Sequence, residues 1–167
     1  EWARTGSRGY DLAIAAVHGD IPQMLKLTDG LSAAVAKMQF AKKAEMAVRI
    51  FLNHRDPRLN GCTAAIGAAE HNRIEAVRLL HEMRADLDKP NTAQGATPAA
   101  NAAQNGHRAM VQLLYDVGAD VHRARNDGSR PIHPAARDGY DKTVPLLLSL
   151  SGDIDAQTHR GNTPCWK

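Results

Sequence analysis

The sequence predicts an all-α protein made of repeated pairs of short helices, and two observations favour this class. A glycine-led phrase recurs four times, with glycines at positions 61, 95, 128 and 161 that are 34, 33 and 33 residues apart. Alanine accounts for 28 of 167 residues, and aromatic residues for only 4%. Alanine and leucine suit closely packed helices, whereas a β-sandwich core is rich in β-branched and aromatic residues. Short helices are marginal alone, so each pair must bury its apolar face on the next pair, and we expect a solenoid.

Composition and charge exclude several other classes. Lysine and arginine number 21 against 18 aspartate and glutamate residues, for a formal charge of +3, so nucleic acid is an unlikely partner. We find no apolar run long enough for a transmembrane helix and expect no membrane insertion. Two cysteines 103 positions apart exclude a disulfide framework. We expect an intracellular protein, cytoplasmic or nuclear, and a fragment of a longer chain because the sequence begins at Glu1 without a methionine.

Each period predicts a helix, a tight turn and a second helix. In the Gly95 period, Thr97 and Pro98 are typical of an N-cap and first helical residue, and an alanine-rich stretch follows. Gly106 supplies the left-handed residue that ends this helix. The second helix carries apolar residues at helical spacing and ends at Gly118. A closing phrase places an aspartate 25 residues after each of the first three glycines, at Asp86, Asp120 and Asp153.

These segments resemble ankyrin repeats, whose hallmark is a Gly-x-Thr-Pro-Leu-His-x-Ala-Ala phrase. The match is strong over 95–121 and 128–154, looser over 61–87, and degenerate from Gly30, while 12–20 resembles the first helix and turn of an opening repeat. The resemblance implies a solenoid of about four to five repeats over residues 10–167, after a flexible segment 1–9. Its approximate units are 10–29, 30–60, 61–94, 95–127, 128–160 and the incomplete 161–167.

Departures from the family phrase mark the weaker repeats. The histidine that ties neighbouring loops in the family survives only as His133. Arg130 replaces the threonine N-cap. Pro134 falls near a helix start, where proline is tolerated, but Pro145 is expected deeper in the second helix, where it could cost about 3 kcal/mol.

No motif for catalysis or cofactor binding is found, so the sequence predicts a non-enzyme without cofactors. It has no phosphate-binding loop, no paired-histidine zinc motif and no nucleophile elbow. Cys62 follows a repeat glycine and is expected to be an ordinary exposed or half-buried thiol. Cys165 takes a core position. The histidines are spread over separate repeats, and no metal site is expected.

The resemblance assigns partner binding to the turns and the exposed side of the first helices, which form a concave face. Stacked repeats use such a face for partner proteins. Between His122 and Arg137 four arginines accompany one aspartate, and we expect a basic ridge that suits an acidic surface on a partner. The candidate partner-binding residues are Gln94, Asn101, Gln104, Asn105, Arg125, Asn126, Ser129, Arg137, Asp138, His159 and Arg160.

The sequence therefore predicts a non-catalytic protein–protein interaction module. It leaves three alternatives open: an accessory domain of a larger enzyme or channel, a nucleic-acid binder that uses the basic turns, and an engineered binding protein on the same scaffold.

Overall fold

The computed structural model describes residues 5–36, 49–55, 57 and 60–164. Within these residues the chain is helical with connecting turns and contains no strand, which confirms the all-α prediction. Residues 49–52 are also helical. The remaining helices are α1 (Thr5–His18), α2 (Ile21–Ala36), α4 (Ala64–Glu70), α5 (Ile74–Glu82), α6 (Pro98–Gln104), α7 (Arg108–Asp116), α8 (Ile132–Arg137) and α9 (Thr143–Ser149).

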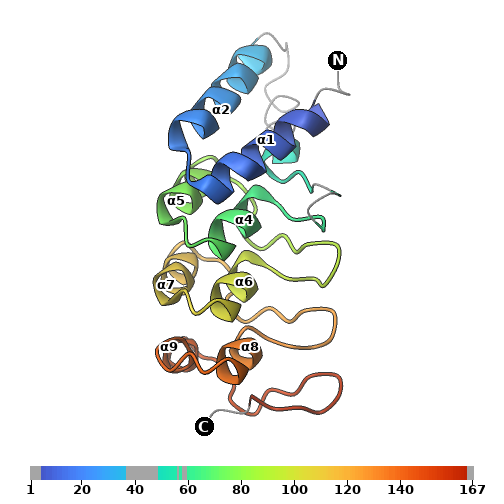
Figure 1. Ribbon diagram of the computed structural model, residues 1–167, viewed down its shortest axis with the longest axis vertical. Coiled ribbons are helices and arrows are strands. Elements are labelled where there is room, and N and C mark those ends of the chain that lie inside the picture. The colour runs from blue at the N-terminus through green and yellow to red at the C-terminus, as the bar shows by residue number, and fades with distance from the viewer. Residues whose placement is uncertain (1–4, 37–48, 56, 58–59, 165–167) are drawn as a thin grey trace.

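The helices from α4 onward form antiparallel pairs that stack one on the next (Figure 1). Helices α4, α6 and α8 form one column, and α5, α7 and α9 form a second column beside it (Figure 1). At the N-terminal end, α1 packs against both α2 and α4. A long loop follows each pair and projects to the same side, next to the column of first helices (Figure 1). The 33-residue spacing in the sequence therefore corresponds to one helix pair and one loop.

Small side chains allow the first helices to pack closely. Four alanines of α6 are at most 1% exposed, and four alanines of α4 are at most 3% exposed. The second helices contribute the larger apolar groups, with a valine and a leucine at equivalent positions in each pair. These fully buried residues are Val77 and Leu80, Val111 and Leu114, and Val144 and Leu147. The alanines of the first helices and the larger apolar residues of the second helices thus form two layers of one continuous core.

Helix ends follow the predicted capping signals in two of the three repeats. The hydroxyl oxygens of Thr63 and Thr97 accept hydrogen bonds from the backbone N–H groups three residues later, at 3.3 and 3.2 Å. Arg130 supplies no such cap, and α8 begins at Ile132, one residue later than the equivalent position in α6. Instead, the backbone N–H of Arg130 donates to Nδ1 of His133 at 3.1 Å.

Three sequence expectations differ from the structure. The helix α1 begins at Thr5, so residues 5–9 of the segment predicted as flexible are helical. Gly30, expected to open a repeat, lies inside α2, which continues to Ala36. The second half of that expected repeat falls partly outside the described residues. Pro145 is the third residue of α9 and not deep in a helix, because α9 starts two residues later than the pattern of α7 implies.

The position of Pro145 predicts a small effect of its replacement. The first four N–H groups of a helix have no intrahelical partner, so proline costs little there. We expect Pro145→Ala to change the free energy of unfolding by less than about 1 kcal/mol. Urea unfolding of both proteins measures the difference. A stabilisation near the full helix-interior cost would contradict the observed helix start.

Among the described residues, Arg84 and Ser151 are the side chains other than glycine and asparagine with a positive φ, a conformation that favours glycine. Arg84 and Ser151 have φ values of 65° and 73°, and they match the position of Gly118, whose φ is 86°. A non-glycine residue in this region costs about 1–2 kcal/mol. We expect Arg84→Gly and Ser151→Gly each to raise the free energy of unfolding by about 1 kcal/mol. Thermal unfolding checks this, and an unchanged or lower melting temperature in both variants would contradict it.

Candidate partner-binding surface

The loop tips of successive repeats are joined to one another. The Thr92 hydroxyl donates to the Asn60 carbonyl at 3.1 Å. The backbone N–H of Asn126 donates to the Gln94 carbonyl at 3.0 Å, and that of His159 to the Asp127 carbonyl at 3.0 Å. We call these three contacts the tip ladder. It fixes the spacing between neighbouring loops, so that residues from different repeats form one edge.

Repeat glycines permit this close approach. Gly95 and Gly128 have φ values of 70° and 80°. A Cβ added at Gly95 would lie 2.3 Å from Oδ1 of Asn126, and one at Gly128 would lie 2.8 Å from the backbone nitrogen of His159. The sequence signal that located the repeats therefore also marks where each loop touches the next.

A second series of contacts links the closing phrases of the repeats. The side-chain oxygen of Asn53 accepts from the Asp86 N–H at 2.8 Å, and an Asp88 carboxylate oxygen accepts from the Asp120 N–H at 2.8 Å. Burial raises the pKa of the Asp88 carboxyl above its usual value. Sequence reasoning missed Asn53 and Asp88, although both lie 32 or 33 residues before their partners, close to the repeat period.

Arg125 is held against α6. Its Nη2 donates to Oε1 of Gln104 at 2.6 Å, and longer contacts of 3.5 Å reach the Asn101 side-chain oxygen and the Ala100 carbonyl. Burial lowers the pKa of the guanidinium. Three predicted site residues, Asn101, Gln104 and Arg125, are thus brought together from neighbouring repeats.

The other predicted site residues are arranged in pairs or at exposed positions. Arg137 binds Asp138 through two contacts, Nε to Oδ1 at 2.7 Å and Nη2 to Oδ2 at 3.0 Å. The Asn105 side-chain amide donates to the Asn101 carbonyl at 3.0 Å. Gln94, Asn126, His159 and Arg160 are exposed in the loops.

The expected basic ridge is less uniform than its sequence implies. Arg125 is half-buried, Arg137 is paired with Asp138, and Nη1 of Arg123 donates to the Asp88 carbonyl at 3.3 Å. Arg130 is exposed. Several of the charges counted in the sequence are therefore already engaged within the protein.

Asp127 and Ser129 form a closed turn at the loop tip. One carboxylate oxygen of Asp127 accepts from the Ser129 hydroxyl at 2.6 Å and from its backbone N–H at 2.9 Å. These two bonds hold the pKa of Asp127 below its usual value. Because the folded-state pKa is depressed, the stabilisation is present above the unfolded-state pKa and is lost as the pH falls through the folded-state pKa.

The lowered pKa of Asp127 predicts how the stability of a Ser129→Ala variant depends on pH. The variant loses the hydroxyl bond, so we expect it to be less stable than the wild type at neutral pH. The difference should shrink as the pH falls below the ordinary aspartate value of about 3.9. Urea unfolding across an acid pH series measures it. A difference that stays constant to the lowest pH would show that the hydroxyl bond does not depend on the Asp127 charge.

His133 ties its repeat to the following loop, as the resemblance implied. Its Nδ1 accepts the Arg130 N–H, which leaves Nε2 to donate to the carbonyls of Ala156 at 3.0 Å and Asn162 at 3.3 Å. Cys62 is half-buried, and burial raises its thiol pKa, which disfavours the reactive thiolate. Cys165 lies outside the described residues.

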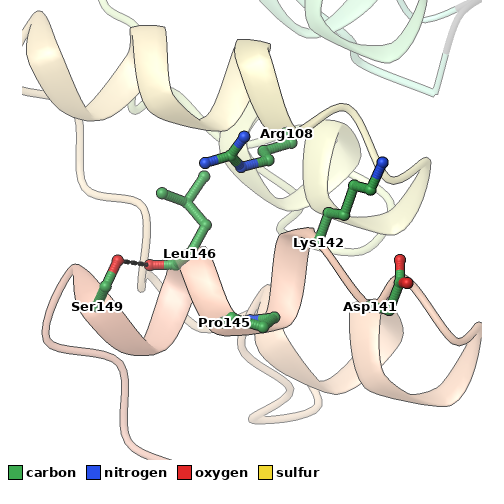
Figure 2. A pocket seen from close by; sticks show the side chains of 6 residues that line it. All are labelled: Arg108, Asp141, Lys142, Pro145, Leu146 and Ser149. Atoms are coloured by element: carbon green, nitrogen blue, oxygen red, sulfur yellow. Dashed lines mark hydrogen bonds between the residues drawn. The ribbon is translucent and has the colours of Figure 1, made fainter.

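A shallow groove of about 380 Å³ lies on the opposite side, between α7 and α9. Its lining side chains are Arg108, Asp141, Lys142, Pro145, Leu146 and Ser149 (Figure 2). Figure 2 shows Arg108 reaching from α7 toward Leu146 of α9. The groove lies where the late start of α9 leaves Asp141 and Lys142 outside the helix. It contains none of the predicted site residues.

The residues that the structure describes lack two features. Among them, no group of three or more histidine, cysteine or acidic side chains is placed to hold a metal ion. None of the helices in the same residues is long and apolar enough to span a bilayer.

Stacked helix pairs with loops joined from one pair to the next define a repeat protein. Residues 62–115 match the family model described as ankyrin repeats (many copies), so this segment is similar to ankyrin repeats. A comparison with curated proteins found no match. Ankyrin repeats are generally protein–protein interaction modules and are typically non-catalytic.

Proposed function

We propose that this chain is a non-catalytic interaction module that binds a partner protein through its loop tips and first helices. In this proposal the helix pairs form a solenoid of about four to five repeats, and its concave face carries the site. The observation that supports it most directly is the tip ladder, which aligns polar residues of four successive loops along one edge. A preformed surface of this kind reduces the entropy lost on binding.

The alternatives left open by the sequence use the same face. An accessory domain of a larger enzyme or channel, or an engineered binder on this scaffold, would also present the loops and first helices to a protein. An acidic partner surface and a location in the cytoplasm or nucleus stay predictions.

The test begins with capture of a partner by the immobilised chain. The affinity of that partner is then measured for variants on the loop side and on the α7 side of the stack. Asn126→Ala and Arg160→Ala alter exposed loop residues, and their combination should weaken partner binding about tenfold or more. The control is Tyr115→Ala, at an exposed position of α7 in the other helix column. Equal binding by the loop variant, or a loss confined to the α7 variant, would contradict the proposed face.

A further inference from the structure

The contacts of Arg125 determine the orientation of two side-chain amides. Oε1 of Gln104 accepts the 2.6 Å hydrogen bond from Arg125, so the opposite end of this amide, Nε2, is left as a donor. The Asn101 oxygen faces the same Nη2 atom at 3.5 Å, which leaves Nδ2 as its outer group. Each amide therefore turns its acceptor inward and its donor outward.

The outward donors are accessible to a ligand. Gln104, Asn101 and Arg125 are all half-buried residues. Among the described residues, the buried side-chain nitrogen and oxygen atoms without a partner are Arg55 Nε, Arg125 Nε and Thr143 Oγ1. Because Gln104 Nε2, Asn101 Nδ2 and Arg125 Nη1 make no hydrogen bond to the described protein and are absent from that set, these atoms still contact solvent.

Charges of both signs lie near Arg125, and the opposite charge of Asp127 acts on it more strongly than the like charge of Arg137. The neighbouring Arg137 acts on Arg125 as a like charge, and Asp127 acts as an opposite charge. Arg137 is itself paired with Asp138, and Asp127 is bonded to Ser129. The guanidinium of Arg125 makes its hydrogen bonds to neutral amide and carbonyl groups, so no carboxylate bonds to it directly.

We propose that Asn101, Gln104 and Arg125 form a subsite that binds one acidic side chain of the partner protein. The subsite offers only donors, from two amides and a guanidinium, and a carboxylate is the protein side chain that only accepts hydrogen bonds. Hydrogen bonds to a charged carboxylate are stronger than those between neutral groups. A lysine or arginine of the partner meets only donors and is excluded. This subsite rests on the proposed function, because it lies on the proposed binding face.

The substitution Gln104→Glu tests the subsite with little change of shape. The new carboxylate keeps the oxygen that accepts from Arg125, so the fold and the contact are retained. It replaces the outward amide donor by an acceptor and neutralises the guanidinium, which removes the site for an incoming carboxylate. The matched control is Gln23→Glu, the same change of charge at an exposed position near the start of α2.

The probe is a displayed library of random peptides, selected on the immobilised wild-type chain. We expect selected peptides to share aspartate or glutamate at one position, and replacement of that residue by its amide to weaken binding about tenfold. Gln104→Glu should weaken binding of the selected acidic peptide by a similar factor. Replacement of the acidic residue by its amide should then weaken binding to this variant little further. Gln23→Glu should leave both affinities unchanged.

The other outcomes separate the subsite from the proposed function. Selected peptides without a shared acidic position, or equal affinity for Gln104→Glu, overturn the subsite while leaving partner binding intact. If no peptide is selected, both proposals fail. Binding of a random single-stranded oligonucleotide that is lost in Gln104→Glu, without acidic peptides, would assign the donors to phosphate and also overturn the proposal.

Discussion

Gly128→Ala is expected to lower the free energy of unfolding by about 3 kcal/mol, one of the two largest effects we predict for a single substitution. Gly128 has a φ of 80°, which costs an alanine about 1–2 kcal/mol. The added Cβ would also lie 2.5 Å from Cδ2 of His159 and 2.8 Å from its backbone nitrogen. The loop of 157–163 has to move, and the hydrogen bond from His159 to Asp127 is lost with it.

Gly118→Ala is the matched control, because it separates backbone strain from crowding. Gly118 has a similar φ of 86°, but a Cβ there meets nothing within 4 Å. We expect Gly118→Ala to lower the free energy of unfolding only by the cost of the strained backbone, about 1 kcal/mol. Urea unfolding of both variants measures the two values. Equal losses would mean that contact between adjacent loops adds nothing to the stability of the array.

His133→Ala is the second large effect, and it should be concentrated at one end of the stack. The substitution removes the acceptor of the Arg130 N–H and the donor to Ala156 and Asn162, and it leaves a cavity at a residue that is 9% exposed. We expect a loss of about 3 kcal/mol. Because repeat arrays are stabilised mainly by nearest neighbours, amide exchange should accelerate in residues 152–164 and change little in α6.

His107→Ala provides the comparison for this experiment. His107 is half-buried, and its ring makes one contact, from Nε2 to the Glu70 carbonyl at 2.9 Å. Its removal should cost about 1 kcal/mol and leave residues 152–164 protected. If His133→Ala also leaves their exchange unchanged, the bridge from His133 does not hold the last loop in place.

Much of the fold is predictable because its turns require particular residues. Gly106 and Gly118 adopt positive φ, and Thr97 with Pro98 begins a helix, as their spacing in the sequence indicates. The same reasoning misses Arg84 and Ser151, whose side chains give no sign that the backbone is left-handed. It also places a turn at Gly30, where the surrounding residues continue a helix despite the glycine.

The repeat pattern predicts which residues form the candidate site, and that assignment stays a prediction, but the pattern does not predict the contacts between them. The repeat pattern assigns Gln104 and Arg125 to the same face, yet they lie 21 residues apart, which is not a multiple of the period. Their contact depends on the length of the Arg125 side chain and on the height of one loop above the next helix. Sequence periodicity gives the order of the repeats along the stack, whereas such a contact depends on side-chain reach.

The tip ladder has a mechanical consequence for a protein that is pulled along its stack. At each described interface a single hydrogen bond joins the loop tips, while the helix columns adhere mainly through apolar contact, which has no preferred direction. Tension applied to the loop edge is therefore borne by bonds in series, and they break one interface at a time. The edge lengthens in increments of one repeat while the helices remain packed, so the array behaves as a spring whose stiffness differs between its two sides.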